Sequence, residues 1–332
     1  MVNKLICIAA AIWFLGTTGA FAGGIFPSLG EERSGTSVMT FLKIGVGARA
    51  AGMGGAYTAI ATDAYALYHN PAGIAFNDND CFAFTYRQWV VDFQHNFLGV
   101  TKHIDRSNVI GLYVITLGTD SFEMTDEYHP TGNGEMFDYS TFAAGLTYAI
   151  RLTEYFSFGI TAKYAQENLD DLKMRAGMID LGTMYQTDYY GTRFAISMSN
   201  FGGRVKPSGS YLYQNSSGEW ITKSYQSFSS PTVFKFSVAF DPISSENNRI
   251  TWVSQLNHPT DNAENFAFGA EYGYKELFFL RGGYLFNSSA EKYSLGAGMK
   301  FDIRHFKGSF DYAYTDMEDL GGTNVFSIML EF

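Results

Sequence analysis

Beyond residue 80 the chain alternates between apolar and polar residues, and the alternation continues to the last residue. In one such run, Phe310 and Tyr312 stand on either side of Asp311. A period of two puts the apolar side chains on one face of an extended strand and the polar side chains on the other. The pattern predicts fourteen strands, at 80–88, 93–102, 107–118, 136–149, 155–166, 173–187, 191–201, 231–240, 249–257, 264–274, 277–286, 290–301, 305–315 and 321–332.

These strands fit a membrane barrel better than a soluble sandwich of two sheets. Their number is even, and most are 9 to 12 residues long, about what a tilted strand needs to cross hydrocarbon. The two longest connections, 119–135 and 202–230, both follow odd-numbered strands, whereas most others are short and 241–248 is intermediate. Long loops on one side and tight turns on the other are typical of outer-membrane barrels. We therefore predict an all-β fold, a 14-stranded antiparallel transmembrane β-barrel over 80–332.

Both ends of the chain indicate export to an outer membrane. Lys4, the apolar run 5–15 and Ala20-Phe21-Ala22 have the layout of a signal peptide, so we expect residues 1–22 to be removed. Eleven apolar residues are too few for a membrane helix, which needs about 20. The last strand ends on alternating apolar residues with an aromatic terminus, which resembles the assembly signal of outer-membrane barrels: Phe326, Ile328, Leu330 and Phe332.

Between these ends lies a glycine- and alanine-rich segment, residues 45–55. Gly45-x-Gly47-x-x-Ala50 matches a dinucleotide-binding fingerprint, and Asp63 lies near the required acidic position. That fingerprint needs a parallel βαβ unit, and no alternating strand–helix pattern follows, so we disfavour a nucleotide site.

A short helix is expected next, because apolar residues from Tyr57 to Tyr68 recur with helical spacing. Pro71 would end it, since the residue before a proline avoids helical geometry. The preceding Phe41-Leu42-Lys43-Ile44 has the composition of a strand. Small residues elsewhere in the segment would let it pack in a narrow space.

Composition excludes some classes of partner and supports a chain rich in strands. The formal net charge is -10 and no basic run occurs, which argues against a nucleic-acid partner. Aromatic residues make up 17% of the chain, which contains 35 glycines and only 7 prolines. This composition is expected of a chain with many β-strands. Loss of Cys7 with the signal peptide would leave Cys81 alone, so we expect no internal disulfide.

No enzyme signature is found. The sequence has no Gly-x-Ser-x-Gly and no His-Glu-x-x-His, and its six histidines are scattered singly. We therefore expect neither enzymatic activity nor a cofactor or metal site. A triad assembled from distant strands stays open at this point, because catalytic groups meet in space rather than in sequence.

Residues 45–59 closely resemble the N-terminal block of the PorV/PorQ family, and 61–64 and 68–73 continue the likeness. These proteins are similar to the FadL family of outer-membrane transporters. The resemblance implies that residues 23–79 form a hatch, with a short helix, inside the lumen of the barrel. It makes candidate hatch residues of Gly45, Gly47, Arg49, Gly52, Gly54, Gly55, Asp63, Asn70, Pro71 and Gly73. Inside a lumen the two charges among them would each need a partner on the wall.

The same resemblance implies a role in type IX protein secretion, in which the barrel receives secreted proteins by their C-terminal signal domains. Partners would then be outer-membrane lipid, secreted proteins and secretion-system subunits. The aromatics of the second long loop are candidate contacts: Tyr211, Tyr213, Trp220, Tyr225 and Phe228. An equally open alternative is that this loop only folds over the barrel mouth.

A second function also follows from the resemblance, passive transport of a hydrophobic small molecule in the manner of FadL. Transport would require an apolar pocket and a break in one strand. The glycine-containing strands 107–118 and 290–301 are candidates for that break, although glycine is also common at ordinary bulges. The sequence leaves open which function applies, whether the lumen is sealed and what the oligomeric state is.

Overall fold

A computed structural model describes residues 35–125, 127–170, 172–288, 290–303 and 306–332. The predicted signal peptide, residues 1–22, lies outside the described residues, as do residues 23–34. Within the described part of the chain, no helix has the length and apolar character needed to cross a bilayer.

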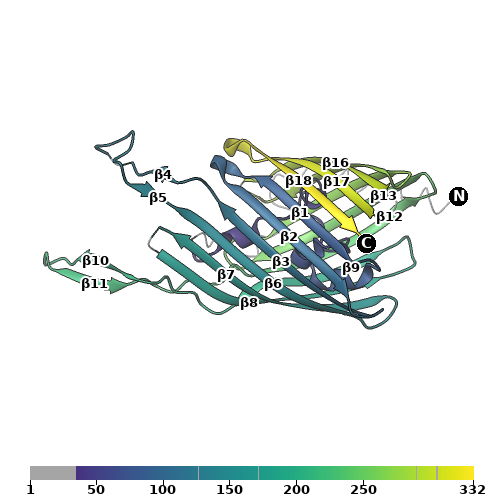
Figure 1. Ribbon diagram of the computed structural model, residues 1–332, viewed down its shortest axis with the longest axis horizontal. Coiled ribbons are helices and arrows are strands. Elements are labelled where there is room, and N and C mark those ends of the chain that lie inside the picture. The colour runs from purple at the N-terminus through teal and green to yellow at the C-terminus, as the bar shows by residue number, and fades with distance from the viewer. Residues whose placement is uncertain (1–34, 126, 171, 289, 304–305) are drawn as a thin grey trace, which may run out of the picture.

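Fourteen strands form one closed antiparallel barrel, in which β1 pairs with the last strand, β18, to complete the ring (Figure 1). Side chains alternate between the two faces of the wall: Leu112 is 54% exposed on the outside and its neighbour Tyr113 is buried inside. The strands are β1 Cys81–Gln88, β2 Gln94–His103, β3 Asn108–Gly118, β6 Tyr139–Arg151, β7 Phe156–Leu169, β8 Leu172–Gln186, β9 Arg193–Gly202, β12 Val233–Ser244, β13 Asn248–Pro259, β14 Asn265–Tyr274, β15 Phe278–Phe286, β16 Tyr293–Ile303, β17 Phe306–Asp316 and β18 Gly322–Glu331.

The predicted number of strands and their antiparallel order are confirmed, and each predicted range overlaps one barrel strand. The connection expected at 241–248 is shorter than predicted. A register shift between Phe240 and Ile243 lets β12 continue to Ser244, so only residues 245–247 join it to β13. Extra residues in one strand are accommodated in this way without ending the pairing.

The two long connections each contain a small hairpin. β4 Phe122–Glu123 pairs with β5 Met136–Phe137, and β10 Ser210–Gln214 pairs with β11 Trp220–Ser224. Figure 1 shows both hairpins projecting from the same end of the barrel, away from the C-terminus. They share an end because both follow odd-numbered strands of the ring. We call this the hairpin end, and the opposite end, where β1 begins and β18 ends, the turn end.

Ahead of the barrel lies the N-terminal segment, residues 35–79. It contains four short helices, the 3-10 helix η1 Thr40–Lys43, the α-helices α2 Ala48–Ala51 and α3 Ala66–His69, and the 3-10 helix η2 Pro71–Phe76. Elsewhere, η3 Val90–Asp92 and η4 Glu318–Leu320 lie in connections of the barrel. The strand-like Phe41-Leu42-Lys43-Ile44 is therefore helical, and that prediction is wrong. Its Phe41 and Leu42 are both buried, which explains their apolar character without a sheet.

The predicted helix from Tyr57 is also shorter than expected. One turn forms at Tyr57, whose carbonyl oxygen accepts the N–H groups of Ile60 and Ala61 at 2.9 Å, but it does not continue. The N–H groups of Tyr57 and Thr58, which have no acceptor within the turn, donate to Oε1 of Gln255 on β13 at 3.2 and 3.0 Å. The Asp63 carboxylate accepts the N–H of Tyr65 at 3.0 Å, which favours a turn. Regular helix begins only at Ala66. It ends at His69, before Asn70-Pro71, as the proline predicted.

Two pairs of strands carry register shifts, β8 with β9 between Ile179 and Leu181, and β12 with β13. The strand breaks expected in 107–118 or 290–301 are not found in the described pairings. β3 pairs with both neighbours in continuous register, and so does β16. Glycine there serves close packing: a Cβ on Gly111 would lie 2.3 Å from Cδ2 of Leu67 in the N-terminal segment.

Candidate functional site

The N-terminal segment is bound by strands on all sides of the barrel. Inward-facing serines, which are small enough to let backbone approach the wall, hydrogen-bond its main chain at 2.7–3.1 Å. They are Ser157 on β7 with Ala72, Ser197 on β9 with His69, Ser294 on β16 with Gly54, and Ser327 on β18 with Ala48. These four strands are distributed around the ring, so the segment is fixed at many points.

The predicted hatch residues all lie in this segment, and two of its glycines are required sterically. A Cβ on Gly73 would lie 1.7 Å from the carbonyl oxygen of Ala61, and one on Gly54 would lie 2.9 Å from the backbone N of Tyr284 on β15. Gly54 also has a φ of +64°, which L side chains rarely adopt. By contrast, a Cβ on Gly45 would meet nothing within 4 Å. The remaining members of the set are Gly47, Gly52, Gly55, Asn70 and Pro71.

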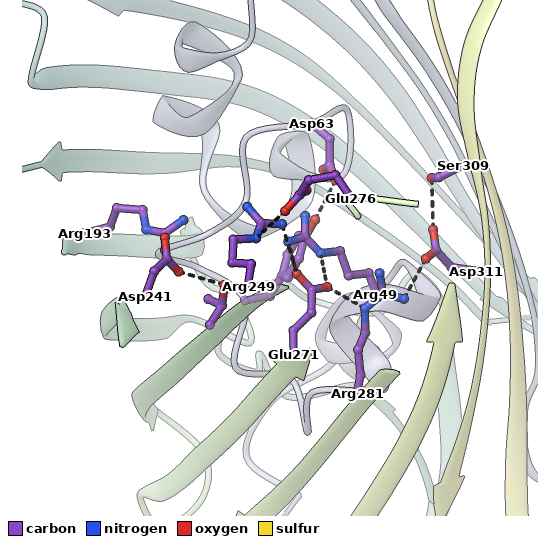
Figure 2. A network of polar contacts seen from close by, with 12 residues as sticks. Arg49, Asp63, Arg193, Asp241, Arg249, Glu271, Glu276, Arg281, Ser309 and Asp311 are labelled. Atoms are coloured by element: carbon purple, nitrogen blue, oxygen red, sulfur yellow. Dashed lines mark hydrogen bonds and ion pairs between the residues drawn. The ribbon is translucent and has the colours of Figure 1, made fainter. Parts of the chain in front are cut away.

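Arg49 is the centre of a charged network on the wall (Figure 2). Its Nε and Nη2 donate to the two carboxylate oxygens of Glu271 on β14, at 2.8 and 2.7 Å. Arg281 on β15 donates to the same carboxylate at 2.6 Å and to Asp311 on β17 at 2.6 Å. Arg249 lies 3.8 Å from Glu271. Because the carboxylate is buried and faces several guanidinium groups, it fixes the N-terminal segment to three strands.

Asp63, the other charge that was expected to meet the wall, instead finds its partners within the segment. Its Oδ2 accepts the hydroxyl of Tyr57 at 2.6 Å, and its Oδ1 accepts the N–H of Tyr65. Burial raises the pKa of Asp63, and it outweighs the opposing effects of the Arg49 charge and these hydrogen bonds. Asp63 therefore stabilises the turn that precedes α3 rather than the contact with the barrel.

Asn70 connects this turn to the opposite wall. Its Nδ2 donates to the carbonyl oxygens of Thr183 on β8 and of Thr58, at 3.2 and 3.3 Å. Its Oδ1 accepts the N–H of Ala72 at 3.2 Å and caps η2. Asn70 is fully buried, so each of these bonds is needed to offset its desolvation.

Two cavities lie against opposite sides of the segment. The hairpin-end cavity has a volume of about 260 Å³ and is lined mainly by polar and cationic side chains, including Lys43, Arg87, Lys163 and Lys235. The turn-end cavity, of about 160 Å³, is lined by residues that include Arg49, Asp63 and Lys300. The two cavities share no lining residue, so the segment separates them.

A third feature lies on the outer wall next to the register shift of β8 and β9. This outer groove, of about 850 Å³, is lined mostly by apolar residues of β3 and β6–β9, among them Leu112, Leu146, Ile179 and Phe201. Lys163 lines both this groove and the hairpin-end cavity. The groove and the cavity therefore meet at this side chain.

A buried ion pair holds that position. Lys163 Nζ lies 2.8 Å from Asp180 Oδ2, and the two side chains are 2% and 1% exposed. Asn200, which has a φ of +59° in β9, accepts from Lys163 at 2.6 Å and donates its own N–H to Asp180 at 2.6 Å. Sequence reasoning missed this group. The sequence feature that could have indicated this group is a charged residue at an inward-facing strand position, among neighbours that are apolar or small, as in Ala162-Lys163-Tyr164.

The aromatics proposed for the second long loop gather on and beside the β10–β11 hairpin. Trp220 is 64% exposed, and the Lys223 ammonium lies 3.9 Å from the centre of the Tyr213 ring. Tyr211 and Tyr225 pack against each other, with ring centres 5.2 Å apart. Phe228 lies at the base, where it pairs with Val205. In Figure 1 the hairpin extends away from the barrel mouth, so the alternative of a loop folded over the mouth does not describe it.

The C-terminal strand forms the seam of the barrel. Phe326 and Ile328 point outward and are 40% and 41% exposed, and Leu330 follows on the same face of β18. Phe332 is 59% exposed, and its N–H donates to the carbonyl oxygen of Asp80 at 3.0 Å, just before β1. These residues complete the ring next to the first strand.

The structure is thus a closed fourteen-stranded antiparallel barrel whose strands hydrogen-bond its own N-terminal segment, and its fold is that of FadL-like barrels. The chain is similar in fold to a Pseudomonas aeruginosa FadL homologue, with a TM-score of 0.52, 11% identity, and coverage of 86% of this chain and 98% of the homologue. It is also similar to the Ralstonia pickettii toluene transporter TbuX (TM-score 0.54, 13% identity, coverage 86% and 97%). A third similar structure is the Pseudomonas putida toluene transporter TodX, with a TM-score of 0.53, 14% identity, and coverage of 86% of this chain and 97% of TodX.

The family is given by the sequence. Residues 28–261 match the family of the type IX secretion system protein PorV, and the chain belongs to that family. The matched range includes the N-terminal segment and the barrel as far as the loop after β13. No curated protein matches the chain.

Proposed function

We propose that this protein is an outer-membrane component of type IX secretion that binds secreted proteins or secretion-system subunits at its hairpin end. Family membership supports the secretion pathway, because the matching family is that of a type IX secretion system protein. The exposed hairpins supply a surface on which such binding would occur. We also propose that residues 1–22 direct export and are removed.

Membrane insertion is supported by the outer face of the wall. Large apolar side chains point outward from strands all round the ring, including Phe84, Leu98, Leu146, Ile160, Phe236, Leu280 and Phe310, each at least 37% exposed. A belt of this kind would be unfavourable in water and is what a barrel presents to lipid. Charged side chains such as Glu271, Arg281 and Asp311 face inward instead.

We propose further that the N-terminal segment acts as a hatch with α3 inside the lumen. Support comes from its contacts with strands around the ring and from the separate cavities on its two sides. A hatch held by a buried ion pair and several serine contacts would open only at considerable free-energy cost. This favours a protein that binds at its surface over an open channel.

The observation that carries the proposal is the β10–β11 hairpin. Every residue of β10 and all residues of β11 except Ile221 are exposed, so this two-stranded ribbon packs little against the rest of the protein. A ribbon of this size is marginally stable by itself. Its exposed aromatics, above all Trp220, are the residue types that dominate protein–protein binding. Such a surface is best explained by a protein partner.

Affinity capture tests the proposal. The full-length protein would be compared with a variant in which residues 210–224 are replaced by a short Gly-Ser turn, and with a matched variant that shortens the β4–β5 loop. We expect capture of secreted proteins or secretion subunits by the wild type and a loss of at least tenfold in the first variant. Capture that is equal in all three proteins would contradict the proposal.

A second function, transport of a hydrophobic small molecule, is favoured by the outer groove. The groove is apolar, lies beside the register shift of β8 and β9, and shares Lys163 with the hairpin-end cavity. A ligand could pass there only if the pair of Lys163 and Asp180 separated. Uptake of a radiolabelled aromatic compound that depends on Lys163 would favour this function over secretion.

A further inference from the structure

The hairpin-end cavity contains two cations that form no hydrogen bond or ion pair with the described residues of the N-terminal segment. Arg87 comes from β1 and Lys235 from β12, which lie seven strands apart in either direction around the ring. The two side chains thus approach the same cavity from opposite walls. Between them lie Tyr68 and His69 of α3, which also line it.

Neither cation has an ion-pair partner among the described residues. Arg87 is 3% exposed, and its guanidinium lies 5.2 Å from the centre of the Trp89 ring. The Lys235 ammonium lies 5.5 Å from the centre of the Tyr68 ring. Aromatic faces offset only part of the desolvation of a cation, so both charges are poorly balanced.

The other two cations of the cavity show the contrast. Lys43 is paired with Asp261 at 2.7 Å, and Lys163 with Asp180 at 2.8 Å. Among the described residues, Glu291 is the one carboxylate in the lining. Once the two ion pairs are set aside, Arg87 and Lys235 together face this single carboxylate, and the cavity keeps an excess of positive charge.

Several side-chain polar atoms around the cavity have no hydrogen-bond partner among the described residues. Lining residues on different walls contribute Arg87 Nε, His69 Nδ1, Ser199 Oγ and Thr315 Oγ1, and the strands beside Arg87 contribute both ring nitrogens of His95 and Thr323 Oγ1. His95 is opposite Arg87 in the pairing of β1 with β2, and Thr315 is opposite Thr323 in the pairing of β17 with β18. Buried polar groups are normally hydrogen-bonded, so a cluster of such atoms indicates a ligand or water. Water would satisfy the hydrogen bonds but would not balance the charge.

The rest of the lining is suited to a polar ligand. Gln255 donates to Asn257 at 2.7 Å, and Asn257 donates to Asn265 at 2.7 Å, which forms a row of amides along the wall. The cavity volume of about 260 Å³ is enough for a phosphate or a small carboxylate. An uncharged aromatic hydrocarbon would leave these groups and the two cations unsatisfied.

We infer that the hairpin-end cavity is a binding site for a small oxyanion, a carboxylate or phosphate group held between Arg87 and Lys235. The ligand would enter from the hairpin end, because most of the lining comes from strand ends on that side. The site is independent of the hairpins and of the proposed role in secretion, and it would persist in a protein whose hairpins had been shortened.

Binding to the purified full-length protein in detergent tests the inference. The probes are inorganic phosphate and, separately, butyrate, measured by calorimetry and by the shift in thermal midpoint. The variants are Arg87→Gln, Lys235→Gln, the double variant and Lys235→Arg, and the control is Lys223→Gln on the exposed hairpin. Each lost charge-assisted contact should weaken binding by about 10- to 100-fold, whereas Lys235→Arg should retain it.

Saturable binding of either probe that the double variant loses and the control keeps would support the site. Preference for one probe would identify which oxyanion it takes. The double variant should fold, because it removes poorly balanced charges, and its thermal midpoint without ligand should be equal to or above that of the wild type. The inference is overturned if neither probe binds more tightly than about 10 mM, or if the double variant binds as well as the wild type.

Discussion

Arg49 donates two parallel hydrogen bonds to Glu271, a residue 222 positions later in the chain. This bidentate contact joins the N-terminal segment to β14, and Arg281 and Asp311 extend it across the wall. The side chain of Glu271 is 1% exposed, so its charge is offset almost entirely by these guanidinium groups.

Glu271→Gln should release the N-terminal segment without unfolding the barrel. The change leaves buried guanidinium groups without their carboxylate, a loss of about 3–5 kcal/mol. The strand ladders on either side of Glu271 are untouched, so heat-modifiable migration of the barrel should persist. Hydrogen exchange should show faster exchange over residues 45–60.

The matched control is Glu276→Gln. Glu276 pairs with Arg249 in the same network, but its side chain is 50% exposed, so we expect a loss of about 0–1 kcal/mol. Equal effects of the two substitutions on exchange would contradict the role given to Glu271.

Gly73→Ala should destabilise the protein strongly, because the new Cβ would fall 1.7 Å from a backbone oxygen that has no room to move. We expect a loss of about 1–3 kcal/mol or more and a lower yield of folded barrel. Gly45→Ala is the control, since its Cβ meets open space. Thermal unfolding in detergent measures the stability of both variants. A Gly73→Ala protein as stable as the Gly45→Ala protein would contradict the close approach of Gly73 to the Ala61 carbonyl oxygen.

Acid should loosen the N-terminal segment through His69. Burial, followed by the nearby charge of Lys235, lowers the pKa of His69 to about 3, although its hydrogen bond to Val46 opposes this. When the pKa of a base is lower in the folded state than in the unfolded state, the protein has its full stability only above the pKa of the unfolded state, which is about 6.5 for histidine. Stability is therefore lost as the pH falls from about 6.5 to 3.

The measurement is protease resistance of the segment across that pH range. In His69→Gln the side-chain N–H can still reach the Val46 carbonyl, and the titrating group is gone. We expect a flatter pH profile for this variant. A profile identical to that of the wild type would assign the acid sensitivity to another group.

Most of the fold could be predicted from the sequence, because the strands alternate strictly between exposed apolar side chains on the outer face and buried side chains on the inner face. Phe310 and Asp311 show this directly, the first exposed and the second buried. The number of strands and the odd-numbered position of the long loops followed from the same pattern. The hairpins within those loops did not, because their pairing depends on local turns.

The partners of the charged residues could not be predicted. Arg49 was expected to need a wall partner, and Glu271 supplies it, but that choice depends on the register of strands more than 200 residues away. Asp63 was expected to need one too, and a nearby tyrosine hydroxyl satisfies it instead. The helix from Tyr57 was overpredicted because the Asp63 carboxylate accepts the N–H of Tyr65 in a turn that interrupts the helical hydrogen bonds.

Glycine content did not locate the irregular strand, since the candidate ranges 107–118 and 290–301 both pair in continuous register. The shift between β8 and β9 is accompanied instead by Asn200, whose φ of +59° and buried bond to Asp180 fit an irregular backbone. Asparagine is the residue type that tolerates this conformation best after glycine. An inward charge on each of two neighbouring strands, Lys163 and Asp180, was the available signal.

Photo-crosslinking in living cells tests the central claim, that this barrel acts by binding proteins at its hairpin end. A benzoylphenylalanine would replace Trp220, which is 64% exposed on β11, or Tyr189, which is 73% exposed in a turn at the opposite end. We predict crosslinks to a secreted protein or a secretion subunit from position 220 and none to such proteins from position 189. The absence of any protein crosslink at position 220, in cells that are secreting, would contradict the account.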